Sequence, residues 1–422
     1  MRRNHKIFAI LMAGLLLTGC AAGAIEDVAT EKEQDQIVEE TENANDAQQA
    51  ESLSEQTEFA VPASCYLDAR TAPEAHSTVR GLGATELVAE MKVGWNLGNT
   101  MDALGGETAW GNPTVTQEMI DALADKGFNT IRIPTSWGQF TEGASGDYMV
   151  KTEWITRVGE VVDYALAKDM YVILNTHHET EWLVPNADKV GDGTEKFTCI
   201  WTQIATYFAD YGDHLIFEGL NEPREVGVNS EWIGGTEENR SMIADWERIF
   251  VETVRATGGN NANRLLLVTG EAACMMDDAL KDIYIPENDP CLGVSLHAYT
   301  PYDFTFKHTG DYDTWDGSHL SDIQWTFSQA DKYFLSKGIP VVMTEYGAER
   351  KGPAEDNNDA EVCKWITDYL TIAQEHNVPT VLWDNGITDG NGERFGYLNR
   401  RELTWDRESI IDAMMAVIYA DR

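Results

Sequence analysis

Two glutamates, Glu222 and Glu345, follow runs of apolar residues that are typical of buried parallel strands. The run 215–220 leads to Glu222, and Pro223 then ends the strand because proline lacks a backbone donor. A carboxylate at the end of a buried strand is costly to desolvate unless it is paired or has a function. An ion pair with Arg224 would be a purely structural explanation. A second carboxylate facing Glu222 would favour catalysis, and Glu345 is the candidate.

Two facing carboxyl groups suit glycoside hydrolysis. One must be protonated to give a proton to the leaving oxygen, and the other must be ionised to attack or stabilise the anomeric carbon. A carboxylate beside a fixed cation stays charged, whereas one beside another anion is pushed towards its neutral form. Arg132 and Tyr299 are suited to hold one carboxylate ionised. Asn221 is suited to meet the sugar 2-hydroxyl, and Trp383 to form the floor of the subsite at the cleavage point.

The elements that must position these residues alternate regularly along the chain. Apolar runs predict strands over 93–97, 130–133, 171–174, 215–220, 265–268, 292–296, 341–343 and 380–382. Helical spacing predicts helices over about 114–127, 154–166, 197–211, 239–257, 277–282, 321–337, 360–376 and 408–419. In the first of these helices, Thr114 and Gln117 are spaced as a capping box.

Eight strands and eight crossovers over about 335 residues predict an α/β fold of the (β/α)8 TIM-barrel type. A doubly wound open sheet is the alternative. Such a sheet more often carries a glycine-rich phosphate turn after its first strand, and this sequence has none there. The barrel is therefore the favoured architecture.

In such a barrel, chemistry lies at the carboxyl ends of the strands. The polar or aromatic residues at the predicted strand ends are Arg132, Asn175, His177, His178, Asn221, Glu222, His297, Tyr299, Glu345, Tyr346, Trp383 and Asp384. A lone histidine after a strand is more often a buried core residue than a catalyst. So many polar strand ends facing one rim are better explained by a site.

Four motifs contain or flank these residues. They are Asn221-Glu222-Pro223, Thr344-Glu345-Tyr346-Gly347, Gly94-Trp95-Asn96-Leu97-Gly98-Asn99-Thr100 and Glu107-Thr108-Ala109-Trp110-Gly111-Asn112-Pro113. The first two resemble glycoside hydrolase family 5, the retaining endo-β-glycanases of clan A. The last two resemble its endoglucanase and xyloglucanase subgroup. The resemblance covers nearly the whole predicted domain, and its one departure is Thr344, where glycine is common in the family.

The resemblance implies a role for each position that the family keeps for catalysis. Glu222 is then the acid/base, and Glu345 is the nucleophile that forms a glycosyl-enzyme. The supporting positions are Arg132, His177, Asn221, His297, Tyr299 and Trp383. Further sugar contacts are expected at Asn99, Trp110, Trp137, His178, Trp182 and Trp232. No cofactor and no metal are expected.

A retaining endo-β-1,4-glucanase (cellulase) acting on cellulose-like or mixed-linkage β-glucan is therefore the leading hypothesis. Xyloglucanase, mannanase and xylanase are alternatives on the same scaffold, since loops set the width of the cleft. A non-catalytic glycan-binding lipoprotein is disfavoured because both carboxylates are present. A metal-dependent hydrolase would use the His-His-Glu sequence at 177–179. Adjacent residues at a strand end point in opposite directions, so we do not expect both imidazoles to share a metal.

The first twenty residues predict export. A basic start precedes an apolar run over 7–17 that is too short to span a membrane. The run ends in Leu17-Thr18-Gly19-Cys20, which resembles a bacterial lipobox. We therefore expect a signal peptide over 1–19 and a lipid anchor on Cys20, which would hold the protein on the outer side of the cell membrane. Plain secretion, after cleavage within 21–24, is the alternative.

The net charge of −40 would repel phosphate backbones, which argues against a nucleic-acid partner. The segment 25–58 carries twelve Asp or Glu residues against the single Lys32 and few apolar residues, which predicts a disordered acidic tether. We expect the lipidated Cys20 and this linker to cover 20–84 and one catalytic domain to cover 85–422. No dimer signature is evident, so a monomer is expected.

Beyond Cys20, five widely scattered cysteines remain. They are Cys65, Cys199, Cys274, Cys291 and Cys363. No C-x-x-C spacing indicates a metal site, and the cysteines are too sparse for a disulfide scaffold. One disulfide would suit an exported protein, with its pairing left open.

Overall fold

The computed structural model describes residues 59–143, 146–306, 313–352, 357–390 and 392–420. The chain divides into two units, Met1–Phe59 and Ala60–Arg422, and the second is compact. The predicted signal peptide, the lipidation site at Cys20 and the acidic segment 25–58 lie outside the described residues. The second unit contains the whole of the predicted catalytic domain.

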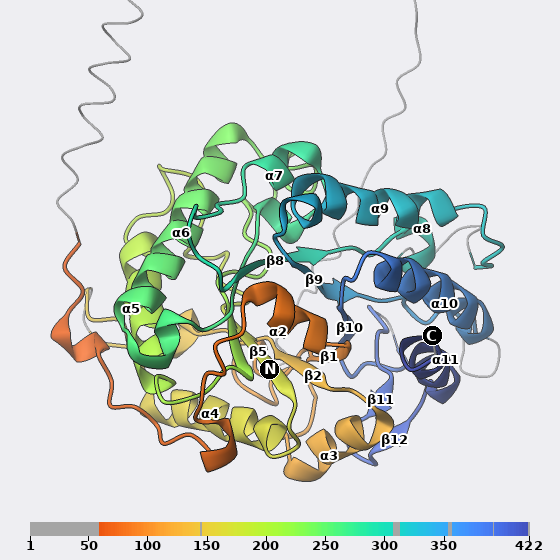
Figure 1. Ribbon diagram of the computed structural model, residues 1–422, viewed down its shortest axis with the longest axis horizontal. Coiled ribbons are helices and arrows are strands. Elements are labelled where there is room, and N and C mark those ends of the chain that lie inside the picture. The colour runs from red at the N-terminus through yellow and green to blue at the C-terminus, as the bar shows by residue number, and fades with distance from the viewer. Residues whose placement is uncertain (1–58, 144–145, 307–312, 353–356, 391, 421–422) are drawn as a thin grey trace, which may run out of the picture. The chain divides into compact units, whose positions relative to one another are not determined.

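Eight parallel strands close into a barrel at the centre of this unit (Figure 1). They are β1 (Val93–Leu97), β2 (Thr130–Ile133), β5 (Tyr171–Asn175), β6 (Leu215–Glu218), β7 (Leu266–Val268), β8 (Leu292–His297), β9 (Val341–Tyr346) and β10 (Thr380–Asp384). Each pairs with the next in chain order, and pairing of β1 with β10, from Val93↔Thr380 to Leu97↔Asp384, closes the ring. The predicted (β/α)8 barrel is confirmed.

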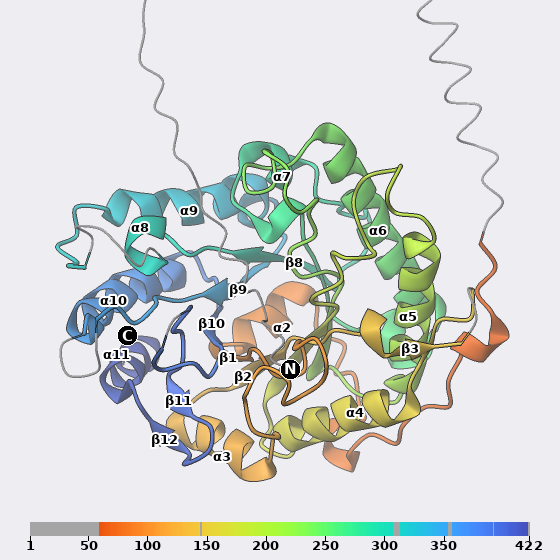
Figure 2. The same ribbon diagram turned by 180° about the vertical axis from the view of Figure 1, so that it is seen from behind.

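Helices surround the barrel and cover the outer faces of its strands (Figures 1 and 2). The α-helices are α2 (Ala84–Glu90), α3 (Gln117–Lys126), α4 (Thr152–Leu166), α5 (Gly193–Tyr207), α6 (Glu237–Ala256), α7 (Asp277–Lys281), α8 (Tyr302–Thr305), α9 (Leu320–Tyr333), α10 (Asp359–Glu375) and α11 (Glu408–Ile418). The short 3-10 helices are η1 (Ala63–Cys65), η2 (Glu74–His76), η3 (Gly138–Phe140), η4 (Gly259–Ala262), η5 (Glu271–Ala273) and η6 (Leu335–Lys337).

Two small antiparallel hairpins lie in loops of the barrel. The first pairs β3 (Thr141–Glu142) with β4 (Met149–Val150) after β2, and the second pairs β11 (Leu398–Asn399) with β12 (Thr404–Trp405) after β10. Neither was predicted, because strands of two residues carry no apolar periodicity.

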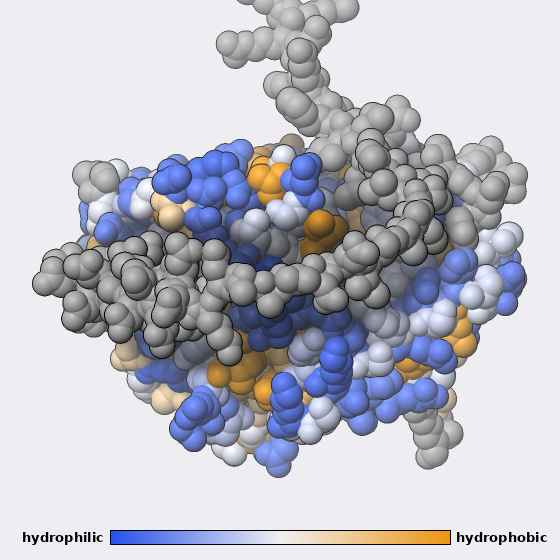
Figure 3. Space-filling model, turned by 90° about the horizontal axis from the view of Figure 1, so that it is seen from above, coloured by the Kyte–Doolittle hydropathy of each residue, from blue (hydrophilic) through white to orange (hydrophobic). Residues whose placement is uncertain are grey.

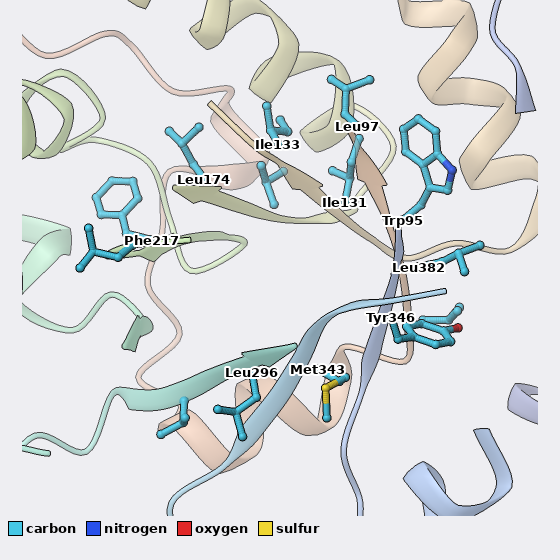
Figure 4. Packing of buried hydrophobic residues seen from close by; sticks show 14 of the residues in the cluster. Trp95, Leu97, Ile131, Ile133, Leu174, Phe217, Leu296, Met343, Tyr346 and Leu382 are labelled. Atoms are coloured by element: carbon cyan, nitrogen blue, oxygen red, sulfur yellow. The ribbon is translucent and has the colours of Figure 1, made fainter. Parts of the chain in front are cut away.

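Alternation along the strands sends apolar side chains outwards and polar side chains inwards at the carboxyl end of the barrel. Figure 4 shows part of the outward set, in which Trp95 and Leu97 of β1 lie in the same apolar core as Ile131 of β2. The residues that alternate with them, Asn96 and Arg132, are fully buried and hydrogen-bond to each other. The alternation that places apolar side chains in the core therefore also places the Arg132 guanidinium inside the barrel.

Four strands extend beyond the apolar runs that predicted them. β5 reaches Asn175, β8 reaches His297, β9 reaches Tyr346 and β10 reaches Asp384. The apolar pattern ends early because these strand ends carry polar side chains, whereas the backbone ladder continues. Relative to both neighbouring strands, β9 has one extra residue between Met343 and Tyr346. This β-bulge contains Glu345, and bulges of this kind re-aim side chains at active sites.

The helix α3 begins at a different cap from the predicted one. Thr116 is its N-cap, and Thr116 Oγ1 accepts a hydrogen bond from the Met119 backbone N–H (3.3 Å). The expected capping box of Thr114 with Gln117 is wrong because Gln117 is already the first helical residue. Gly127 ends the helix at φ 112°, a left-handed conformation that glycine adopts without strain.

The helix α2 closes the amino-terminal end of the barrel, and Figure 1 shows it lying across the middle of the ring. Its Leu87 and Val88, with the following Met91, pack in a second apolar cluster with Ile216 of β6 and Val342 of β9. Burial of one such side chain contributes about 1.5–3 kcal/mol. The helix therefore stabilises the barrel as well as covering it.

Residues 60–83, here called the N-terminal strap, also belong to the folded unit. We expected the linker to continue to residue 84, and this boundary is wrong. Arg70 of the strap forms an ion pair with Asp163 of α4 (Nη2–Oδ2 2.7 Å), and its backbone N–H donates to the Tyr207 carbonyl (2.8 Å). Because such polar contacts have no apolar periodicity, the hydrophobic pattern of the sequence did not reveal the strap.

The described residues contain neither a disulfide nor a helix long and apolar enough to cross a bilayer. Cys65 in η1 and Cys199 in α5 are both buried, and the Cys65 thiol donates to the Asp147 carbonyl (3.8 Å). The coloured part of the surface in Figure 3 is mostly hydrophilic, with apolar residues in separate patches.

Candidate active site

Glu222 and Glu345 face each other at the carboxyl-terminal end of the barrel. Glu222 follows β6, and Glu345 lies in the bulge of β9. A carboxylate oxygen of one lies within 4.8 Å of a carboxylate oxygen of the other. Retaining glycosidases hold their two carboxyl groups about 5–5.5 Å apart, whereas inverting enzymes leave about 6.5–9.5 Å for a water molecule. The spacing therefore fits direct attack of one carboxylate on the sugar.

Arg132 links the strands that carry the two glutamates. Its buried guanidinium donates to Glu345 Oε1 (2.6 Å) and to Asn221 Oδ1 (2.7 Å). Two further bonds reach Glu218 Oε2 (2.7 Å) and Asn96 Oδ1 (3.0 Å). A buried cation needs such partners because desolvating it costs several kcal/mol. Since Asn221 uses its oxygen here, its amide NH2 group remains as a donor for a ligand.

Glu218 is a buried residue of this network that the sequence analysis missed. It is the last residue of β6, and besides Arg132 it accepts a hydrogen bond from the Ser295 hydroxyl. Ser295 is in turn hydrogen-bonded to Thr344, the one position that departs from the family pattern. We included Glu218 in an apolar run because one carboxylate does not break such a run. Its charge was the available signal, since buried charges are normally paired.

Residues from β8 and the loop after it contact both carboxylates. The Tyr299 hydroxyl donates to Glu345 Oε2 (2.9 Å). His297 Nδ1 lies 2.8 Å from Glu222 Oε1 and 3.7 Å from Glu345 Oε2.

Arg224 lies 3.5 Å from Glu222 Oε2, a loose contact, and its Nη1 donates more closely to the Glu222 backbone carbonyl (2.8 Å). The ion pair with Arg224 therefore does not explain the position of the Glu222 carboxylate.

Trp383, in β10, and His177, after β5, form a flat stacked pair beside the glutamates. Their ring centroids are 5.9 Å apart and their planes differ by 2°. Burial lowers the pKa of His177 well below 6.5, so this ring is neutral at physiological pH. A Cβ at Gly98 would come within 2.8 Å of the Trp383 indole and 2.8 Å of the Asp384 carbonyl oxygen. Only glycine at this position lets the ring lie where it does.

Two of the loop tryptophans proposed for sugar stacking are exposed. Trp110 is 41% exposed and lies against His178, with ring centroids 5.4 Å apart. Trp232 is 40% exposed, and the Arg224 guanidinium lies over its ring at 4.3 Å. Both rings keep apolar surface that a pyranose face could cover.

The other two loop tryptophans are used in packing. Trp137 is fully buried, and its Nε1 donates to the Asn175 carbonyl (2.8 Å), so the expected substrate contact at Trp137 is wrong. Trp182 is half-buried; its Nε1 donates to Glu179 Oε2 (2.7 Å), and Lys196 lies 4.4 Å from its ring centre. The exposure of an aromatic residue in a loop depends on its neighbours in space, which the sequence does not show.

His177 and His178 lie closer together than we expected. Their rings meet edge to face with centroids 4.5 Å apart, and one ligand atom each from Asp102, His177 and His178 lie within 4.8 Å of one another. They converge because β5 ends at Asn175, so strand alternation no longer separates them. Asp102 Oδ2 also accepts the Asn99 backbone N–H (3.0 Å), which helps to hold Asn99 in a left-handed turn at φ 55°. The cluster has metal-ligand chemistry, but its carboxylate already serves this turn.

Burial and neighbouring charges act in opposite directions on the two carboxyl groups. Burial raises the pKa of Glu345, and attraction to His297 and Arg132 offsets this only in part. Burial would also raise the pKa of Glu222, but the hydrogen bond with His297 and the nearby guanidinium groups outweigh it and lower the pKa. Without a bound sugar, a proton shared by the pair is thus favoured on Glu345. Contact with Arg132 alone would have the opposite effect, because a neighbouring cation favours the ionised form of Glu345.

Comparisons with known proteins match the same part of the chain. A family model described as cellulase (glycosyl hydrolase family 5) matches residues 96–389, which include Glu222 and Glu345. Endoglucanase A of Ruminococcus albus is 47% identical over 345 residues, which are 80% of this chain and 93% of the relative.

Solved structures show the same fold. A GH5-4 broad-specificity endoglucanase from Ruminococcus champanellensis with bound cellotriose has a TM-score of 0.76 and 41% identity, covering 80% of this chain and 99% of that chain. A GH5 xyloglucan-specific endo-β-1,4-glucanase from a metagenomic library, in complex with cellotriose, has a TM-score of 0.74 and 44% identity, covering 78% of this chain and 98% of that chain.

Proposed function

The chain belongs to glycosyl hydrolase family 5, and on that basis we propose that it is a retaining endo-β-1,4-glucanase that hydrolyses internal bonds of a β-glucan. One observation carries the proposal: carboxylate oxygens of Glu222 and Glu345 lie within 4.8 Å of each other at the carboxyl end of the barrel. This spacing admits an anomeric carbon between the two groups but not a separate water molecule.

The reaction proceeds in two displacements at the same carbon. In the first, Glu345 attacks the anomeric carbon while Glu222 gives its proton to the glycosidic oxygen, so the leaving chain departs and a glycosyl-enzyme ester forms. In the second, ionised Glu222 takes a proton from water, and the water oxygen displaces Glu345 from the carbon. Two inversions restore the original β configuration.

The proton of the pair must lie on Glu222 at the moment of cleavage, although the empty site favours Glu345. A bound sugar shifts this balance in two ways. Positive charge developing at the anomeric carbon favours ionised Glu345, and the glycosidic oxygen can only accept a hydrogen bond, which favours protonated Glu222. Substrate binding is therefore proposed to move the proton from Glu345 to Glu222.

The remaining residues orient the reacting groups. Arg132 and Tyr299 bind the two different oxygens of Glu345 (2.6 and 2.9 Å), so the carboxylate cannot turn away from the sugar. The amide NH2 group of Asn221 is proposed to donate to the 2-hydroxyl, whose hydrogen bond strengthens in the transition state. The Trp383 indole is proposed to form the floor under the sugar at the cleavage point.

The proposed substrate is a glucan with a β-1,4-linked main chain. Two solved relatives hold cellotriose, and the exposed rings of Trp110 and Trp232 offer stacking surfaces in loops at the same end of the barrel. Xyloglucanase is the second candidate, because the xyloglucan-specific relative is 44% identical over 78% of this chain.

Product analysis tests the proposal. The purified protein is incubated with carboxymethylcellulose, mixed-linkage glucan, xyloglucan, mannan and xylan, and reducing ends and viscosity are measured. NMR of a cello-oligosaccharide digest records which anomer forms first. A retaining endoglucanase forms the β-anomer first and lowers viscosity early. An initial α-anomer would overturn double displacement, lack of cleavage of all β-glucans would overturn the function, and cleavage of xyloglucan alone would support the second candidate.

We further propose that the protein is exported as a lipoprotein anchored through Cys20. The support is the apolar run 7–17 and the sequence Leu17-Thr18-Gly19-Cys20. Palmitate labelling and membrane fractionation of the full chain, compared with Cys20→Ala, test this anchor. Loss of label and of membrane association in the variant is expected. Equal partitioning of both proteins would contradict it.

A further inference from the structure

Three side chains with metal-ligand chemistry converge at the end of the barrel opposite Glu222 and Glu345. His76 belongs to the N-terminal strap, Asp169 precedes β5 and His214 precedes β6. Asp169 Oδ1 lies 3.8 Å from His76 Nε2 and 3.8 Å from His214 Nδ1. One ligand atom from each of the three residues lies within 4.8 Å of one from each of the others. Three separate segments of the chain thus point one ligand atom each at a common position.

One imidazole nitrogen of the three residues lacks the hydrogen bond that a buried polar group normally forms. His214 Nδ1 is buried and has no hydrogen-bond partner among the described residues. The His76 side chain is only 9% exposed, and its 3.8 Å contact with Asp169 is too long for a hydrogen bond. Leaving a buried polar atom unpaired costs about 1–3 kcal/mol. Such a cost is removed when a ligand occupies the position between the atoms.

We propose that His76, Asp169 and His214 bind a zinc ion. Two imidazoles and one carboxylate form a common zinc ligand set, and a water molecule can take the fourth position. Bond lengths of about 2.0–2.2 Å place two ligands of a tetrahedral zinc ion about 3.3–3.5 Å apart. The 3.8 Å pairs observed here need to close by only a few tenths of an ångström.

The surroundings favour an oriented and accessible ligand set. The Tyr171 ring stacks on His214 (centroids 4.4 Å apart, planes 18° apart) and holds its orientation. Asp169 is 84% exposed, which gives an ion and its water a path from solvent.

Arg80 is a cation close enough to the proposed site to affect His214, and two carboxylates neutralise its charge. Arg80 pairs with Glu90 (2.9 Å) and with Asp213 (2.8 Å). Its repulsion of a divalent ion is therefore reduced, while Asp169 supplies a negative charge directly to the site. The bound zinc would join the strap to two turns of the barrel, and would stabilise the folded unit by binding it but not the unfolded chain.

Zinc binding to the full mature protein tests the proposal. Protein freed of metal by dialysis against a chelator is equilibrated with Zn²⁺, and bound zinc is measured by mass spectrometry. Asp169→Asn is the main variant because an exposed side chain can be changed without disturbing the core, and His76→Asn is the second. Asp188→Asn changes an exposed carboxylate elsewhere, and His178→Ala disrupts the other histidine cluster; both serve as controls.

The expected result is one zinc equivalent per chain in the wild type and in both controls. Binding should weaken by about 10–100-fold or more in Asp169→Asn and His76→Asn. At free zinc of about 100 times Kd, Tm should rise by roughly 3–5 °C in the wild type and in both controls, but not in Asp169→Asn or His76→Asn. No zinc-dependent change in Tm would show that the three residues form only an ionic contact. Loss of the zinc equivalent in His178→Ala instead would place the ion at the other cluster, and either outcome overturns the proposal.

Discussion

At the scale of single residues, the proposed chemistry depends on which carboxyl group holds one proton. Arg132 and Tyr299 bind Glu345, while His297 binds Glu222, and the pKa of Glu222 is the lower of the two in the empty site. The neighbouring groups give the two carboxyl groups different pKa values, as happens in other sites with paired carboxylates. The roles of Glu222 and Glu345 can be distinguished because only one of them must protonate a leaving group.

Removing each carboxyl group should have different consequences for different substrates. Glu345→Ala should lose activity on both polysaccharide and an aryl cellobioside, because no glycosyl-enzyme can form. Glu222→Ala should lose about 10²–10⁴-fold in kcat/KM on polysaccharide but far less on a dinitrophenyl cellobioside, whose leaving group needs no proton. Stopped assays on both substrates measure this difference. Equal losses on the two substrates in Glu222→Ala would contradict its assignment as the acid.

The pH dependence should respond to His297. Glu222 must be protonated in the enzyme–substrate complex to act as an acid, so kcat falls as pH rises through its pKa in that complex. The hydrogen bond with His297 lowers that pKa, and His297→Ala should therefore raise it and move the alkaline limb of the profile to higher pH, even though activity falls. The control is His319→Ala, a histidine on the surface near α9. An alkaline limb that stays in place or moves to lower pH would show that His297 does not set this pKa.

At the scale of elements, neighbouring strands of the barrel set the geometry of the site. The bulge in β9 carries Glu345, and the end of β10 carries Trp383 next to Gly98, which follows β1. Contact between Gly98 and the indole leaves no room for a side chain. Strand register and the bulge therefore position Glu345 and Trp383, whereas Glu222 lies in the loop that follows β6.

Adding one methyl group at Gly98 should displace the floor of the cleavage subsite. In Gly98→Ala the new Cβ would clash with Trp383 and the Asp384 carbonyl, both at 2.8 Å. We expect kcat/KM to fall by up to about 100-fold, because small misplacements of binding groups have effects of that size. Tm should fall as well, since overpacking costs about 1–3 kcal/mol.

The matched control is Gly347→Ala, which lies two residues after Glu345. Its Cβ would approach Phe395 no closer than 3.3 Å, so a smaller loss is expected. Activity assays and thermal unfolding of both variants provide the comparison. If Gly347→Ala were the more damaging change, the close packing at Gly98 would not be what positions Trp383.

At the scale of the whole molecule, residues before the first strand complete the folded unit. The N-terminal strap forms ion pairs with the barrel, and α2 covers its amino-terminal end with buried apolar side chains. The proposed zinc site would add a third attachment between the strap and the barrel. The catalytic unit therefore begins some twenty-five residues earlier than the apolar pattern predicted, at Ala60 rather than Thr85.

Shortening the chain should show where this unit begins. A chain starting at Phe59 should match the full chain in Tm and in kcat, because it keeps the strap and α2. A chain starting at Thr85 loses the strap and the first residue of α2, so we expect a Tm lower by several degrees or insoluble protein. Circular dichroism melts and soluble yields measure the difference. Equal stability of the two shortened chains would contradict a structural role for the strap.

Local patterns were enough to predict the architecture and most of the site. Eight apolar runs located all eight barrel strands, and helical spacing located the principal helices, because burial imposes a period on each element. Residues at the ends of those runs, such as Glu222, Glu345 and Arg132, then follow from the rule that barrel sites lie at the carboxyl ends of strands. The roles assigned to them stay proposals until the variants above are measured.

Other features depend on contacts between residues far apart in the chain, which no local pattern records. Among these are the burial of Trp137, the ion pair of Glu218 with Arg132, and the convergence of His76 with two turns of the barrel. Periodicity reports which side of an element faces the core, so the amino-acid order alone sufficed for the fold and for placing Glu222 and Glu345 at the same end of the barrel. Exposure, partners and proton positions depend on which groups meet in space, and only folding of the complete unit brings those groups together.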